Sequence, residues 1–171
     1  MLKTRVIPIL LLQGNSVVKT VSFSEPRVVG DAISNVNVFS NRMADEMVIV
    51  DIEATEKGRI NEALIRRLAR QCVMPLTVGG GIQTLVDAQA LFRSGADKVL
   101  INSAFYKDPS LFSQVAAQFG RQALVFSLDV VKTANGYQAV SHSGNNVQSL
   151  SAVAAAQLAV SRGAGEILVN S

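Results

Sequence analysis

The chain has 171 residues, of which 49% are hydrophobic and 17% are charged. This length and composition exclude a disordered protein and predict one domain with a sizeable core. The formal net charge of +3 is small and the basic residues are scattered along the chain, which argues against a nucleic-acid binder.

Short apolar runs alternate with amphipathic stretches from one end of the chain to the other. We expect strands at 5–11, 46–51, 75–79, 97–101, 123–129 and 166–170, and helices at 31–43, 60–72, 84–94, 109–119 and 148–162. The runs 17–23 and 137–142 predict small hairpins in the loops after the first and fifth strands. Strands that alternate with helices indicate an α/β fold with a parallel sheet.

An internal repeat links the two halves of the chain. RVIPILLLQGNSVVK (5–19) resembles QALVFSLDVVKTANGYQAV (122–140), and MADEMVIVD (43–51) resembles GAGEILVNS (163–171). Both offsets lie near 120 residues, so we expect one half-barrel at 1–120 and a second at 121–171 onward. Eight such strand and helix units would close a (β/α)8 barrel, or TIM barrel, of about 240 to 250 residues. We therefore expect 1–171 to form a single barrel domain with about six units present and the C-terminal part missing.

Other features narrow the class of protein. The single cysteine, Cys72, cannot form an internal disulfide, and the N-terminus lacks the pattern of a secretory signal. Without an apolar stretch that could span a bilayer, we expect a cytoplasmic protein with no membrane partner. The one histidine, His142, has no second ligand at metal-site spacing, so we expect no metal and no cofactor.

A glycine-rich turn follows the third predicted strand. In PLTVGGGIQT (75–84), Gly79, Gly80 and Gly81 would let the backbone approach an anion, and the next helix would add unpaired N–H groups. Asn102 and Ser103 end the neighbouring strand with small polar side chains. The turn alone favours a tight turn over a phosphate site, whereas both strand ends together predict a phosphate cradle.

Taken in order, MLKTRVIP, VVKT, GDAI, DEMVIVDI, LTVGGGI, GADKVLIN, SLDVVK and RGAGEIL resemble the cyclase subunit of imidazole glycerol phosphate synthase. The resemblance covers the whole chain. It implies a barrel of the ribulose-phosphate-binding type and a glutaminase partner of the HisH type. In that family the glutaminase passes ammonia through the barrel to a phosphorylated small-molecule substrate at the far face.

The resemblance also implies residue roles. The family has two catalytic aspartates, at the ends of the first and fifth strands; Asp129 matches the second, whereas Leu11 occupies the place of the first. Strand alternation places Leu11 on the interior face, where a leucine cannot transfer a proton. Lys19 matches a lysine that handles the substrate in the loop after the first strand. Asp51 could reach a substrate or cap the next turn.

Four charged residues match a ring at the base of the family's barrel, which the resemblance implies gates the entry of ammonia. Arg5, Glu46, Lys98 and Glu166 lie at the beginnings of four predicted strands, opposite the phosphate end, and we call them the charged ring. Two cations and two anions can neutralise one another in a partly buried site. Asp97 matches a position that faces the glutaminase, although a solvated acid is an alternative.

These residues predict three candidate functions. The first is a HisF-like barrel that receives ammonia and supports amidation of an acetamido sugar by a separate enzyme, in surface-polysaccharide biosynthesis. The second is a cyclase of histidine biosynthesis in which Asp129 carries most of the chemistry. The third is a phosphate-binding scaffold without catalytic activity.

Overall fold

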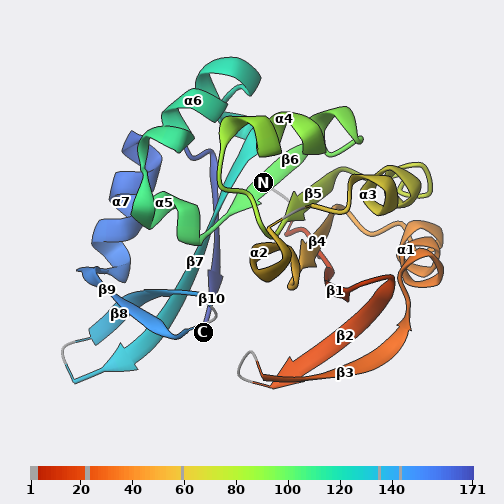
Figure 1. Ribbon diagram of the computed structural model, residues 1–171, viewed down its shortest axis with the longest axis horizontal. Coiled ribbons are helices and arrows are strands. Elements are labelled where there is room, and N and C mark those ends of the chain that lie inside the picture. Colours follow the sequence, from red (N-terminus) through yellow and green to blue (C-terminus); the bar gives the residue numbers. More distant parts are fainter. Residues whose placement is uncertain (1–3, 22–23, 59, 135, 143) are drawn as a thin grey trace. The chain divides into compact units, whose positions relative to one another are not determined.

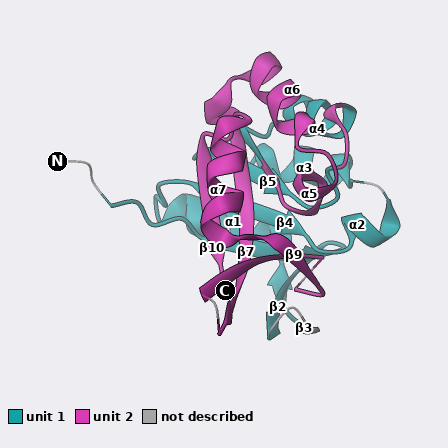
Figure 2. Cartoon of the chain, turned by 90° about the vertical axis from the view of Figure 1, so that its left-hand side faces the viewer, with its two compact units in different colours: residues 1–82, 86–99 teal, residues 83–85, 100–171 magenta. Residues whose placement is uncertain are grey.

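The computed structural model describes residues 4–21, 24–58, 60–134, 136–142 and 144–171 (Figure 1). The chain divides into two compact units, coloured separately in Figure 2. Unit 1 comprises residues 1–82 and 86–99, and unit 2 comprises residues 83–85 and 100–171. Within the described ranges, no helix is long and apolar enough to cross a membrane.

Unit 1 is built on a parallel core of three strands extended by a hairpin. The strands are β1 (Ile9–Gln13), β2 (Ser16–Val21), β3 (Ser24–Asp31), β4 (Met47–Asp51) and β5 (Leu76–Gly79). β1 pairs parallel to β4 and β4 parallel to β5, while β1, β2 and β3 pair antiparallel. The helices are α1 (Ala32–Asn41), α2 (Ala54–Lys57), α3 (Glu62–Ala69) and α4 (Leu85–Arg93), of which α4 lies in this unit from residue 86 onward.

Helix α3 shows how the sequence specifies these elements. The side chain of Asn61 accepts a hydrogen bond from the backbone of Leu64 at 3.1 Å, which caps the first turn. Leu64, Ile65 and Leu68 are buried, as expected of an amphipathic helix that packs through one face. Strand β6 (Lys98–Ile101) begins in unit 1 and ends in unit 2.

Unit 2 contains α5 (Ser103–Lys107), α6 (Ser110–Phe119), a 3-10 turn η1 (Arg121–Ala123), β7 (Leu124–Thr133), β8 (Gly136–Ser141), β9 (Asn146–Ser151), α7 (Ala152–Ser161) and β10 (Glu166–Asn170). β7 pairs parallel to β10, and β7, β8 and β9 pair antiparallel. Phe105, Phe112 and Phe126 form the aromatic core, with Phe105 centroids 4.6 Å from those of both other rings. Each of these rings is fully buried, so they anchor α5 and α6 on β7.

One order of elements occurs in both units. In each, a strand leads into an antiparallel hairpin, a ten-residue helix and a strand parallel to the first; these are β1–β2–β3–α1–β4 and β7–β8–β9–α7–β10. The two helices even start alike, because Asp31 and Ser151 each cap a backbone N–H three residues ahead. This recurrence supports the proposal that the two halves are copies of one unit.

All six expected strands and five expected helices are present, and β10 has the expected bounds while the others are shifted. β1 begins at Ile9 rather than residue 5, directly after Pro8, which has no N–H for a strand ladder. The helix expected at 148–162 begins only at Ala152, because β9 occupies the preceding residues. Hairpins form at both expected places but extend past the expected runs, since β3 continues to Asp31 and β9 to Ser151. Residues 22 and 23 of the first hairpin lie outside the described residues. The short helices α2 and α5 were not predicted, since four or five residues carry too little periodicity.

Candidate functional site

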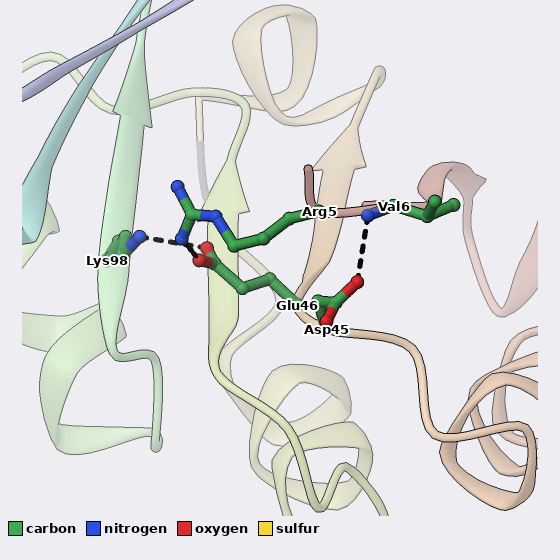
Figure 3. Close-up of polar contacts among 5 residues, drawn as sticks. All are labelled: Arg5, Val6, Asp45, Glu46 and Lys98. Carbon is green, nitrogen blue, oxygen red and sulfur yellow. Dashed lines mark hydrogen bonds and ion pairs between the residues drawn. The ribbon is translucent and has the colours of Figure 1, made fainter. Parts of the chain in front are cut away.

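Three members of the charged ring meet in unit 1, where Arg5, Glu46 and Lys98 form what we call the charged cluster (Figure 3). Glu46, which immediately precedes β4, is 6% exposed. Its Oε1 accepts a hydrogen bond from Nη1 of Arg5, and its Oε2 accepts one from Nζ of Lys98 at 2.8 Å. Both oxygens of this buried carboxylate are therefore paired with cations.

The backbone beside the charged cluster is fixed as well. The N–H of Val6 donates to Oδ2 of Asp45 at 2.9 Å, which ties the segment before β1 to the segment before β4 (Figure 3). Burying an unpaired carboxylate is costly, whereas a carboxylate with two cationic donors is compensated. Glu46 thus depends on Arg5 and Lys98 for its burial.

The fourth member of the predicted ring, Glu166, lies in unit 2 as the first residue of β10. Its place in β10 corresponds to that of Glu46 just before β4. The structure thus brings three of the four residues together within one unit. Participation of Glu166 stays a prediction.

The strand-five aspartate lies in a buried polar network of unit 2. Asp129 is 8% exposed and occupies the middle of β7. Nδ2 of Asn170 donates to its Oδ1 at 3.1 Å, and Nδ2 of Asn102 donates to its Oδ2 at 3.0 Å. Burial raises the pKa of Asp129, and the two amide hydrogen bonds oppose that rise. Burial and the nearby charge of Asp129 also raise the pKa of Tyr106 to about 12.

Asn102 and Ser103, predicted to bind phosphate, hold protein partners in this structure. Asn102 also donates from Nδ2 to the carbonyl of Ser127 at 2.8 Å. The hydroxyl of Ser103 donates to Oδ1 of Asn102 at 3.0 Å and accepts the backbone N–H of His142 at 3.2 Å. Both residues therefore belong to the polar network around Asp129.

The glycine-rich turn has a packing reason of its own. Gly80 has a φ of +100°, and a Cβ there would stand 2.1 Å from the carbonyl oxygen of Asp51. Gly81 has a φ of +71°, and its Cβ would lie 2.7 Å from that of Ala54. Only glycine fits this approach to the turn between β4 and α2. Gly79 ends β5. Since the turn lies in unit 1 and Asn102 and Ser103 lie in unit 2, the shared phosphate cradle stays a prediction.

The other predicted residues have local partners or exposed positions. Oδ1 of Asp51 accepts the backbone N–H groups of Glu53 and Ala54, so it caps the turn, and its pKa is raised mainly by burial. Oδ2 of Asp97 accepts the N–H of Leu76 at 2.8 Å, which holds the start of β5. Lys19 is exposed on β2, opposite Arg27 of β3. These geometries leave the substrate and interface roles as predictions.

Leu11 lies in β1 between two buried neighbours. Leu10 is 6% exposed and Leu12 is 1% exposed, whereas Leu11 is only partly buried, so it occupies the opposite face of the strand. In the parallel pairing of β1 with β4, Leu11 is opposite Val50. No acid stands at this position to supplement Asp129.

Sequence reasoning missed Asn170. This residue is the last of β10 and is opposite Asp129 in the parallel pairing with β7. The signal was present, because an asparagine ended the predicted strand 166–170 and equivalent strand ends meet in a parallel sheet.

Among the described residues, no group of three histidine, cysteine, aspartate or glutamate side chains could hold a metal ion.

Comparisons with known proteins identify the family of this chain. The family profile described as "Histidine biosynthesis protein" matches residues 5–171. The chain is 42% identical to imidazole glycerol phosphate synthase subunit HisF of Hyphomonas neptunium, across 100% of this chain and 68% of the relative. It is 41% identical to the HisF subunit of Exiguobacterium sibiricum, across 100% and 69%. A Campylobacter jejuni protein whose name includes subunit hisF2 of the same synthase is 39% identical, across 100% and 68%. The chain therefore belongs to the histidine biosynthesis protein family of (β/α)8 barrels and is a HisF-like member of it.

Proposed function

We propose that this HisF-like barrel receives ammonia from a glutaminase partner at the amino ends of its strands and directs it toward a phosphorylated substrate at their carboxyl ends. The observation that carries this proposal is the charged cluster, in which the buried Glu46 carboxylate is paired with Arg5 and Lys98. A buried carboxylate with two cations is costly to assemble, and a simpler apolar packing would serve stability as well. A role at the entry of a channel explains why such a cluster is present.

The residues at the carboxyl ends of the strands distinguish two candidate functions, ammonia supply to a separate enzyme and cyclase activity of the barrel itself. Asp129 can accept or donate a proton, whereas Leu11 can do neither. Loss of a positioned acid or base typically lowers a rate by about 100 to 10,000-fold. We therefore propose that the natural acceptor of the ammonia is handled by a separate enzyme, which amidates an acetamido sugar in surface-polysaccharide biosynthesis. Similarity to a protein named as a hisF2 subunit is consistent with a second HisF-like branch.

The retained polar network favours one alternative. Asp129 is buried and hydrogen-bonded on both oxygens, an arrangement expected of a working acid or base. A cyclase of histidine biosynthesis that relies on Asp129 alone is therefore the second candidate. The scaffold hypothesis has no comparable observation in its favour.

Ammonia transfer is tested by mixing the full-length protein with a HisH-type glutaminase and measuring the release of glutamate from glutamine. We expect the barrel to accelerate glutamate release at least about tenfold, a coupling of the size common between two sites. Glu46→Gln should reduce this stimulation, because it leaves Arg5 and Lys98 without their carboxylate. Glu62→Gln is the matched control, since Glu62 forms an exposed pair with Arg66 on α3.

Two outcomes would count against the proposal. Absence of any stimulation by the natural sequence would favour the scaffold hypothesis. Equal stimulation by the natural sequence, Glu46→Gln and Glu62→Gln would show that the charged cluster has no part in the coupling. Circular dichroism of each variant ensures that a lost response does not reflect unfolding.

A further inference from the structure

Two asparagine amides hold the carboxylate of Asp129 from both sides, and we call this arrangement the amide clamp. Asn170 reaches Oδ1 at 3.1 Å and Asn102 reaches Oδ2 at 3.0 Å. The two asparagines come from different elements, the end of β10 and the residue between β6 and α5. Because each oxygen receives a donor, the plane of the carboxylate is fixed rather than free to rotate.

The orientation of Asn102 follows from its remaining partners. Its Nδ2 also donates to the carbonyl of Ser127 at 2.8 Å, while its Oδ1 accepts the hydroxyl of Ser103 at 3.0 Å. Ser103 in turn accepts the N–H of His142. An amide with a carbonyl and a carboxylate on one side and a hydroxyl donor on the other has only one favourable orientation. Asn102 therefore presents its N–H groups to β7.

We propose that Asn102 and Asn170 are positioning residues for Asp129, which they hold ionised and oriented so that it can accept a proton from a bound ligand. The proposal rests on the second candidate of the proposed function, the cyclase in which Asp129 is the acid or base. Neutral donors stabilise the charged carboxylate without cancelling its charge, so the carboxylate stays ionised and can accept a proton. Its remaining lone pairs accept the proton and later return it.

The corresponding position of the first half shows what the clamp adds. Asp129 is opposite Asn170 in the pairing of β7 with β10, and Leu11 is opposite Val50 in the pairing of β1 with β4. Where the acid is absent, its amide partner is absent too. The amide of Asn170 therefore accompanies the acid and is not a general feature of this strand pair.

The clamp is tested by titrating the Asp129 carboxyl in the full chain with carbon-13 NMR, without any substrate. Asn170→Leu removes the donor at nearly constant size and should move the midpoint of the Asp129 titration to higher pH. Asn170→Asp places a second carboxylate opposite the first and should move the midpoint further in the same direction. The matched controls are Asn41→Leu and Asn41→Asp, at an exposed residue that ends α1.

The graded order of natural sequence, Asn170→Leu and Asn170→Asp is the expected result, with no change in the Asn41 variants. An Asp129 midpoint that is the same in all folded variants would overturn the clamp. Asn102→Leu provides the same test from the other side, should an Asn170 variant fail to fold. Because this measurement needs neither glutaminase nor substrate, failure of the clamp and failure of ammonia transfer are distinguished.

Discussion

The strand pairs β1–β4 and β7–β10 occur in the same order of elements, but one pair is apolar and the other polar toward the carboxyl ends of the strands. Each pair is parallel, and each is joined through a hairpin and a ten-residue helix. Toward the carboxyl ends, Leu11 is opposite Val50 in the first pair, whereas Asp129 is opposite Asn170 in the second. The comparison teaches that the same order of elements can carry a polar pair of residues in one unit and an apolar pair in the other.

The amino ends of the same pairs differ much less. Glu46 immediately precedes β4, and Glu166 is the first residue of β10. Both units thus have a glutamate at this end, whereas only β7 has an acid at the position that Leu11 occupies in β1. This asymmetry is the reason to propose that ammonia entry is retained while cyclase chemistry is reduced.

The largest effect is expected at Asp129, because the equivalent position in β1 is Leu11, which cannot transfer a proton. Asp129→Asn should lower the ammonia-dependent cyclase rate by about 100 to 10,000-fold in a protein that also carries Leu11→Asp, because a positioned proton acceptor is lost. Asp108→Asn is the control, since Asp108 is exposed and its Oδ1 accepts the backbone N–H of Ser110 at the start of α6. Steady-state kinetics measure the cyclase rate of both variants. An Asp129→Asn rate equal to that of Asp108→Asn would contradict the assignment of Asp129 as the proton acceptor.

At the amino end, the two cations of the charged cluster should differ in their effect on stability. Lys98→Met leaves Oε2 of the buried Glu46 carboxylate without its cationic partner. This change should lower the free energy of unfolding by about 2–3 kcal/mol. Arg5→Met should cost about 1 kcal/mol or less, because the Arg5 side chain is 50% exposed and solvent screens its pair. Urea denaturation of both variants measures the difference, and equal losses would mean that burial does not separate the two pairs.

A smaller effect tests whether the repeated helices are held alike. Asp31 accepts the N–H of Ser34 at the start of α1, and Ser151 accepts the N–H of Ala154 at the start of α7. Asp31→Ala and Ser151→Ala should each lower the free energy of unfolding by about 1 kcal/mol. Costs that differ by more than about 1 kcal/mol, measured by thermal or urea unfolding, would show that the two halves are not energetically equivalent.

The longer strands and helices could be predicted from the sequence because strand and helix periodicities differ strongly here, whereas the short helices α2 and α5 could not. β10 was expected at 166–170 and spans Glu166–Asn170, and the helix expected at 109–119 spans Ser110–Phe119. The predicted element boundaries were wrong where the conformation of the backbone, rather than the hydrophobic pattern, decided where an element begins. β1 begins only after Pro8, which has no N–H to donate. β9 contains residues 148–151, which the apolar pattern had predicted to be helical.

The candidate site was harder to predict, since partners distant in sequence decide what a polar side chain does. Asn102 is a small donor near a strand end, yet its hydrogen bonds go to Ser127 and Asp129. Gly80 fits a phosphate turn and also the close approach to Asp51. A residue list cannot distinguish these cases, because both depend on contacts that form only in the folded chain.

The central claim, that the first strand end has lost the chemistry that the second keeps, is tested most directly by an ammonia-dependent cyclase assay. The full-length protein should be compared with Leu11→Asp and with Leu11→Asp/Val50→Asn, which rebuilds the carboxylate and amide pair of Asp129 and Asn170. We expect Leu11→Asp to raise the rate by about 100-fold or more, and the added asparagine to increase it further by holding the new carboxylate ionised. A natural protein that already turns over rapidly, with no gain from either variant, would contradict the account and identify the chain as a cyclase that needs only Asp129.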